Sequence, residues 1–455
     1  MHTRGDLMAT DSSTRAGLWQ RARAMAEKTP PERNRYVDFL RALSILAVVS
    51  GHWLVAAPYM KDGAVVGGHL LGILPWSQWL TWLFQVMPVF FLVGGFSNGV
   101  SWSATRRDGG SYAGWYTGRL QRLIYPVLPL FLIWTVVALS GTAFGIDRPV
   151  VKMAAHLALV PVWFLSVYLM VSAVVPLTHA AWRRWGMASF WVLIAGAIAV
   201  DVARLRFGVP YIAFANFGFV WLAVHQLGYA WGEGRFAALW RAAVLALGGL
   251  AALLALVRFG PYPVAMIGVP GSELSNSMPP TLALLALGLA QAGLALLLEP
   301  LGRRWLQNLS AWTGVVLING MIMTVYLWHL TAFVAVMVGA WLLGGIGLHT
   351  APGSGAWWLM RPLWFALYIA LLLPLIGLFS RYENIGRGAD QREVPLPRLI
   401  AGLLLICAGL AATAAISIAS PEGITGVRLW VVALPFIGAA LIGFGPVHRL
   451  VRRRS

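Results

Sequence analysis

The stretch that decides the fold runs from residue 36 to residue 53 and reads YVDFLRALSILAVVSGHW. It is mostly apolar, and a run of about 20 such residues is long enough to cross the hydrocarbon core of a bilayer as a helix. Comparable runs recur along nearly the whole chain of 455 residues, of which 59% are hydrophobic and 11% charged, whereas a soluble domain typically carries about 25% charged residues. The sequence therefore predicts an all-α, polytopic transmembrane helix bundle of about 12 spans.

The expected spans follow the apolar runs, and ten of them form one membrane domain at residues 36–380. They are expected near residues 36–58, 79–103, 120–142, 156–180, 187–204, 210–231, 241–258, 281–299, 311–343, 358–380, 397–419 and 428–447. The run at 311–343 is long for one helix, so we expect it to bend or to continue beyond the bilayer. The remaining segments are expected to be a disordered basic cytoplasmic tail at 1–35, a cytoplasmic linker at 381–396, two additional helices within 397–447 and a basic cytoplasmic tail at 448–455.

The basic residues of the chain indicate its orientation rather than a nucleic-acid partner. The formal net charge is +18, from 34 Lys and Arg residues against 16 Asp and Glu residues. Most of the basic residues lie in short gaps between apolar runs, where they set topology and contact anionic lipid. If the N-terminus is cytoplasmic, most of them fall on the cytoplasmic side, so we expect both termini there and no binding of nucleic acid. A composition rich in Ala, Arg and Gly favours a bacterial plasma membrane.

The sequence contains no pattern typical of a disulfide or a metal site. Its single cysteine, Cys407, lies in an apolar run, so no intrachain disulfide can form. The histidines are scattered and have no cysteine cluster beside them, and we expect no bound metal.

Three polar residues of the first span are expected to share one helical face. Asp38 and Arg41 are three residues apart, and His52 follows Arg41 by eleven residues, which is about three turns. His52 should therefore lie about 16 Å along the axis from Arg41. A charge in the bilayer is costly and usually faces the bundle interior, where it acts on substrate, ion or proton. The alternatives are an interfacial ion pair in which Arg41 reaches the headgroups, and a hydrogen-bonded core histidine at position 52.

This first span resembles the opening motif of the acyltransferase-3 family of polytopic membrane O-acyltransferases, in which an arginine is followed eleven positions later by a histidine. Four further segments resemble motifs of that family in the same order. They are FFLVGGF at 90–96, RLQRLIYP at 119–126, WFLSVYL at 163–169 and YLWH at 326–329. The chain departs from the family at Gly94-Gly95, where Ser-Gly is common, so the serine hydroxyl of that motif is absent here. The last two expected spans lie beyond the resemblance and have no functional interpretation.

The resemblance implies transfer of a short acyl group from cytoplasmic acyl-CoA, such as acetyl-CoA or succinyl-CoA, to a hydroxyl group. The acceptor would be an envelope glycan, a glycolipid or a small metabolite, and membrane lipids surround the protein. His52 would act as the base or carry the acyl group transiently, while Asp38 orients or neutralises Arg41. The residues expected to bind substrate are Arg119 and Arg122, for the phosphates of coenzyme A, and Phe91, Trp163, Tyr326 and His329. The polar face should line a tunnel from the cytoplasm near Asp38 to His52.

Two other classes of function remain open beside the acyltransferase, a transporter or flippase and a non-catalytic scaffold. A multi-span transporter or a lipid or glycan flippase would also suit twelve spans with an intramembrane Asp–Arg pair, but no repeated halves are visible in the sequence. The segment Gly95–Gly99 fits the G-x-S-x-G pattern with Ser97 as nucleophile. That motif needs a strand–turn–helix setting, whereas here it ends an expected membrane helix.

Overall fold

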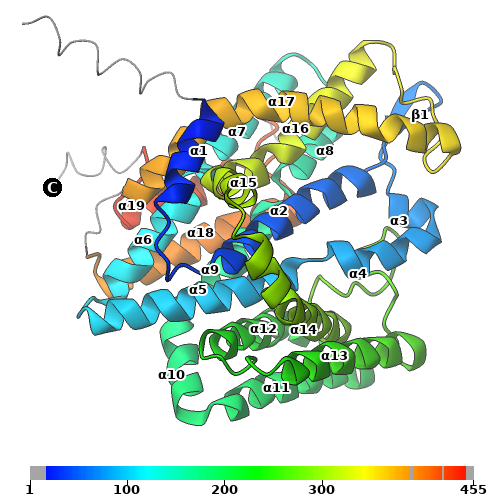
Figure 1. The fold of residues 1–455 in the computed structure, drawn as a ribbon. Helices are drawn as coiled ribbons and strands as arrows, with labels where there is room; N and C mark the ends of the chain where they lie inside the picture. The colour runs from blue at the N-terminus through cyan, green and yellow to red at the C-terminus, as the bar shows by residue number, and fades with distance from the viewer. Residues whose placement is uncertain (1–16, 389–392, 423–424, 447–455) are drawn as a thin grey trace, which may run out of the picture.

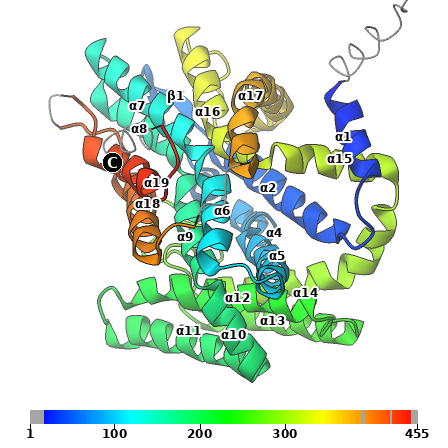
Figure 2. The same ribbon diagram turned by 90° about the vertical axis from the view of Figure 1, so that its left-hand side faces the viewer.

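The computed structural model describes residues 17–388, 393–422 and 425–446, which form a bundle of helices with one small β-hairpin (Figures 1 and 2). The longer helices are α1 (Leu18–Glu27), α2 (Arg35–Val55), α5 (Met87–Arg107), α6 (Tyr112–Ile124), α7 (Val127–Ala143), α8 (Arg148–Leu159), α9 (Val162–Ala173), α10 (Val175–Trp185), α11 (Met187–Phe207), α12 (Asn216–Gly232), α13 (Leu239–Phe259), α14 (Leu282–Trp305), α15 (Leu309–Gly320), α16 (Ile322–Leu342), α17 (Gly355–Gly388), α18 (Leu396–Ile416) and α19 (Leu429–Leu441). Shorter elements are α3 (Leu70–Ile73), α4 (Thr81–Phe84), the 3-10 helices η1 (Pro75–Leu80) and η2 (Ile212–Ala215), and strands β1 (Tyr59–Lys61) and β2 (Ala64–Val66).

Ten helical segments of the described chain are long and apolar enough to cross a membrane. The protein is therefore a multi-pass membrane protein, and the expectation of an all-α polytopic bundle is confirmed. The spans expected at 210–231 and 428–447 correspond to α12 and α19, which have only 17 and 13 residues. The long run expected at 311–343 is two helices, because α15 ends at Gly320 and α16 begins at Ile322.

α2 lies within the bundle and separates two groups of helices. Helices α10 to α13 lie together at the lower side of both views, with α14 packed against α13 (Figures 1 and 2). α5 joins this group to the rest, since it packs against both α12 and α2. On the other side, α16 packs against α2 and α17, and α18 packs against α9 and α19. α2 thus contacts helices of both groups, α14 on one side and α16 on the other.

The contact between α5 and α12 depends on glycine. A Cβ atom on Gly95 would lie 1.8 Å from the carbonyl oxygen of His225, and one on Gly228 would lie 2.3 Å from that of Leu92. No other residue fits at such a close approach of two backbones, because real Cβ contacts are far longer. The glycine at position 95 therefore sets the distance between these helices.

The N-terminal segment differs from the expected disordered tail. Residues 1–16 lie outside the described residues, but Leu18–Glu27 form α1, which packs against α15. Ala22 and Ala26 are one turn apart and buried, because their small side chains let the two helices approach closely. The segment is also held by Trp312, whose Nε1 donates to Thr29 Oγ1 at 2.9 Å. The disorder expected for 1–35 is therefore wrong for residues 18–27, and the tail expected at 448–455 lies outside the described residues.

Candidate active site

The N-terminal end of α2 carries an ion-pair cluster centred on Asp38, whose side chain is buried. Asp38 Oδ1 accepts a hydrogen bond from Arg41 Nη1 at 2.9 Å, and Asp38 Oδ2 accepts one from Arg33 Nε at 2.6 Å. Arg41 Nη2 donates to Ser97 Oγ on α5 at 3.0 Å. The break between α15 and α16 places Asn319 at the same point, where its amide donates to the Asp38 carbonyl at 2.9 Å. The guanidinium group of Arg41 is thus fixed on two sides, and two arginines share one carboxylate.

His52, at the other end of the same helix, forms a hydrogen-bonded pair with His329 of α16. His52 Nδ1 lies 2.9 Å from His329 Nε2, and the two ring planes are nearly parallel, at 7°. His329 Nδ1 lies 2.7 Å from the Tyr326 carbonyl oxygen. A carbonyl only accepts hydrogen bonds, so His329 carries its proton on Nδ1 and presents an unprotonated Nε2.

This chain of hydrogen bonds determines the tautomer of His52. Because His329 Nε2 can only accept, His52 donates through Nδ1–H, and its Nε2 atom keeps its lone pair. Within the described residues, His52 Nε2 has no hydrogen-bond partner in the protein. A neutral imidazole with a free nitrogen and a fixed second nitrogen is the arrangement that a general base or a nucleophile requires.

The histidine pair is held by its own neighbours. Trp53 Nε1 donates to the His329 carbonyl at 3.0 Å, and the Tyr326 hydroxyl donates to the Pro161 carbonyl at 2.6 Å. His329 is fully buried. It does not line the cavity that His52 faces.

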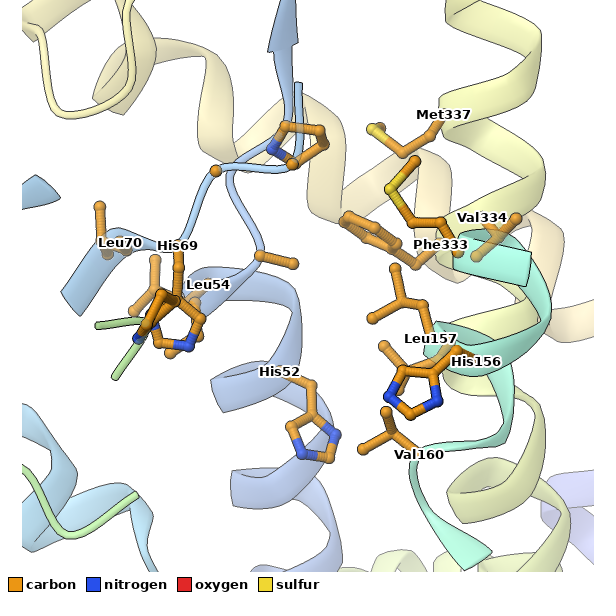
Figure 3. Close-up of a pocket in the computed structure, with 18 of the residues that line it drawn as sticks. His52, Leu54, His69, Leu70, His156, Leu157, Val160, Phe333, Val334 and Met337 are labelled. Atoms are coloured by element: carbon orange, nitrogen blue, oxygen red, sulfur yellow. The ribbon is translucent and has the colours of Figure 1, made fainter. Parts of the chain in front are cut away.

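His52 faces a cavity of about 1160 Å³ (Figure 3). The walls come from the C-terminal half of α2, the β-hairpin, the segment from His69 to Met87, helices α8 and α9, the loop before α14, and α16. None of Asp38, Arg41, Arg119 and Arg122 lines this cavity. The cavity thus opens from His52 away from the ion-pair cluster, and it is not the tunnel that was expected to connect His52 with the cytoplasmic side near Asp38.

The other residues expected to bind substrate occupy different places. Trp163 and Tyr326 line the cavity. Phe91 is fully buried in the core, where its ring stacks on Trp221 at a centroid distance of 4.4 Å. Arg119 on α6 is half-buried and lies over the ring of Trp115 at 4.4 Å, and its Nε has no hydrogen-bond partner in the described part of the chain. Arg122, on the same helix, is exposed.

The structure explains both the glycine at position 94, where the family commonly has serine, and the role of Ser97. A Cβ atom at Gly94 would lie 3.0 Å from the ring of Tyr168, so this tyrosine occupies the space that a serine side chain would need. Ser97 lies inside α5, without a strand or a sharp turn before it, and its hydroxyl accepts from Arg41. The nucleophile-elbow setting is therefore absent around Ser97, which instead helps to hold the arginine.

The structure adds two histidines that the sequence did not single out. His69, which precedes α3, and His156 of α8 line the same cavity as His52 (Figure 3). Their separation in the chain gives no common spacing, so only the fold brings them to one cavity. Among the described residues, no group of three His, Cys, Asp or Glu side chains is placed to hold a metal ion.

Comparison with known proteins gives one match. A protein-family model described as an acyltransferase domain matches residues 34–381, which is close to the expected domain at 36–380. The matched region contains Asp38 and Arg41, the histidine pair and the cavity, whereas Arg33, α18 and α19 lie outside it. We found no significant match among curated proteins and none among solved structures.

Proposed function

The chain belongs to the acyltransferase-3 family and is a membrane O-acyltransferase; from this premise we propose that it moves a short acyl group from cytoplasmic acyl-CoA to a hydroxyl of an envelope glycan or glycolipid. In this proposal the protein lies in a bacterial plasma membrane with both termini in the cytoplasm. Acetyl-CoA and succinyl-CoA are the proposed donors. The observation that carries the proposal is the free Nε2 of His52, which faces a cavity while His329 holds Nδ1.

The chemistry assigned to His52 is general base catalysis. Nε2 removes the proton from the acceptor hydroxyl as the hydroxyl oxygen attacks the carbonyl carbon of the thioester. The tetrahedral intermediate then expels the thiolate of coenzyme A, and the imidazolium of His52 returns the proton to that sulfur. The products are the new ester and free coenzyme A, and atoms and charge balance without a further reactant.

The role proposed for His329 is positioning. Its Nε2 accepts from His52 Nδ1–H, so it keeps the reacting nitrogen unprotonated in the resting enzyme and stabilises the imidazolium when it forms. A buried aspartate serves the same purpose in Ser-His-Asp hydrolases.

The arginines near the N-terminal end of α2 are proposed to bind the donor. Arg41 is fixed by Asp38 and Ser97, and Arg119 lies within electrostatic range of Arg41 and Arg122. A planar guanidinium group suits phosphate oxygens because it donates in a bidentate manner. The phosphates of coenzyme A would bind among these arginines, and the pantetheine arm would reach His52 by a path separate from the cavity described above.

The test is turnover by purified protein in lipid nanodiscs, measured as coenzyme A released from acetyl-CoA in the presence of a bacterial membrane extract. The wild-type protein should release the thiol and form an acetyl ester. His52→Ala should lose about 10²- to 10⁴-fold in kcat, which is the usual contribution of a general base, and should keep its folded helical content. Turnover by the alanine variant at the wild-type rate would remove His52 from the reaction, and absence of thiol release by the wild-type protein would contradict the proposed donor.

A further inference from the structure

The cavity beside His52 has a chemical character that restricts the acceptor. About 1160 Å³ exceeds the roughly 300–1,000 Å³ of a pocket for a drug-sized ligand. Its walls are mainly aliphatic and aromatic side chains, among them Leu157, Val160, Phe333, Val334 and Met337 (Figure 3). A free sugar or a polysaccharide would leave its hydroxyl groups without partners on such walls, at considerable cost. The body of the ligand must therefore be apolar.

The charge of the lining restricts the ligand further. Among the described residues that line the cavity, none is Lys or Arg, and Asp147 is the one carboxylate. A phosphate or carboxylate buried here would have no Lys or Arg side chain in the surrounding wall, which is strongly unfavourable; Lys152, which acts electrostatically on His156, lines a neighbouring pocket. The arginines of the molecule's other polar site, Arg41 and Arg119, lie outside this cavity. An anionic lipid or a lipid diphosphate is thus a poor fit.

Three histidines from separate elements stand out among the polar side chains of the cavity, which also include Gln85, Asp147 and Ser277. The hydroxyls of Ser77 and Thr81, which also line it, already donate to backbone carbonyls at 2.6 and 2.5 Å. His52, His69 and His156 line the cavity from α2, the segment before α3, and α8 (Figure 3). His69 Nδ1 is buried and has no hydrogen-bond partner in the described part of the chain. Burial lowers the pKa of His69, so its ring is neutral at pH 7 and can both donate and accept.

From this arrangement we propose that the acceptor is an uncharged glycolipid. Its sugar head lies among His52, His69 and His156, with one hydroxyl at His52 Nε2, and its hydrocarbon tails lie along the apolar walls. The cavity is built largely from membrane-spanning helices, including α2, α8, α9 and α16, so a molecule with hydrocarbon tails is already concentrated around it. This inference rests on the proposed function and specifies the acceptor of the same site.

The test compares three acceptors with wild-type protein in nanodiscs, using radiolabelled acetyl-CoA. The probes are monoglucosyl diacylglycerol, methyl glucoside as the water-soluble head alone, and phosphatidylglycerol as an anionic lipid with free hydroxyls. Labelled ester and released thiol are both measured. The glycolipid should be acetylated with a KM at least about tenfold below that of methyl glucoside, since even a single methylene in an apolar pocket is worth about tenfold or more.

Two substitutions on α16 test whether this cavity is the binding site. Val334 lines the cavity, whereas its neighbour Ala335 is exposed and does not. Val334→Trp should raise the KM for the glycolipid about tenfold by filling space, and Ala335→Trp should leave it within about twofold. Leu157→Trp fills the same cavity from α8 and replaces Val334→Trp if that variant does not fold.

The outcomes separate the two proposals. Equal use of methyl glucoside, or preference for phosphatidylglycerol, would overturn the glycolipid while leaving the acyltransferase intact. A Val334→Trp protein with an unchanged glycolipid KM but an altered preference between acetyl-CoA and decanoyl-CoA would assign the cavity to the donor's acyl chain instead. Absence of thiol release with every probe and with a membrane extract would refute the proposed function itself.

Discussion

Replacing His329 by leucine removes the hydrogen-bond acceptor of His52 Nδ1 and keeps an apolar side chain in a fully buried position. Two states are then open to His52. It can keep its proton on Nδ1 with no partner, or move the proton to Nε2 and lose the lone pair that faces the cavity. Either state is less reactive than the present one.

The size of the effect follows from the lost hydrogen bond. Leaving a buried donor without its partner costs about 1–3 kcal/mol. At about 1.36 kcal/mol for each factor of ten, kcat should fall roughly 5- to 150-fold. The KM for acetyl-CoA should change little, because His329 does not line the cavity and lies apart from the arginine cluster. This loss is smaller than the one expected for His52→Ala, since the base itself remains.

A second variant distinguishes positioning from packing. The amide oxygen of glutamine in His329→Gln can accept from His52 Nδ1–H, so this variant should recover most of the kcat lost in His329→Leu. Both are measured by thiol release in nanodiscs, after thermal unfolding has shown that they are folded. Normal kcat in the leucine variant, or equal loss in both variants, would refute the role assigned to the histidine pair.

Two other predictions concern α2 and its neighbour α5. Arg41→Lys keeps the charge but loses the planar group that bonds both Asp38 and Ser97, so kcat/KM for acetyl-CoA should fall about tenfold or more; wild-type kinetics would mean that a point charge suffices. Gly95→Ala should reduce the yield of folded protein, because its Cβ would lie 1.8 Å from a backbone oxygen, whereas Gly314→Ala, with nothing within 4 Å, should behave as wild type in thermal unfolding. A normal melting temperature for Gly95→Ala would show that α5 and α12 can separate.

Sequence periodicity predicts contacts between residues of one helix better than contacts between residues of different helices. The spacing of Asp38 and Arg41 correctly indicated that they interact, because residues three apart on a helix are neighbours. The sequence also marked His52 and His329, but not their contact, since 277 positions separate them. Only the packing of α16 against α2 brings the two rings together.

The other differences between the predicted and the observed structure also have local causes. α1 was missed because its stability comes from the packing of Ala22 and Ala26 on α15 rather than from its own apolar content. The hairpin at Tyr59–Val66 follows Pro58 and turns at Asp62-Gly63, two residues with positive φ. The hairpin was not predicted, because the turn is short and the apolar runs on both sides of it strongly predict helices. The sequence did not indicate a role for His69 or His156, because each is an isolated histidine that forms no spaced motif with other residues.

Because α2 is one continuous helix, the distance between its two ends is fixed. The ion-pair cluster and the reactive imidazole sit on a single helix from Arg35 to Val55, so their separation does not depend on any loop or hinge. If the phosphates of the donor are held at one end of α2 and its thioester reacts at the other, the enzyme selects a donor in which the distance from phosphate to sulfur matches the distance between these ends. A truncated thioester such as an N-acetylcysteamine ester lacks the phosphates that the arginines would hold, so it could reach His52 only without this anchor, and its kcat/KM should be lower than that of acetyl-CoA.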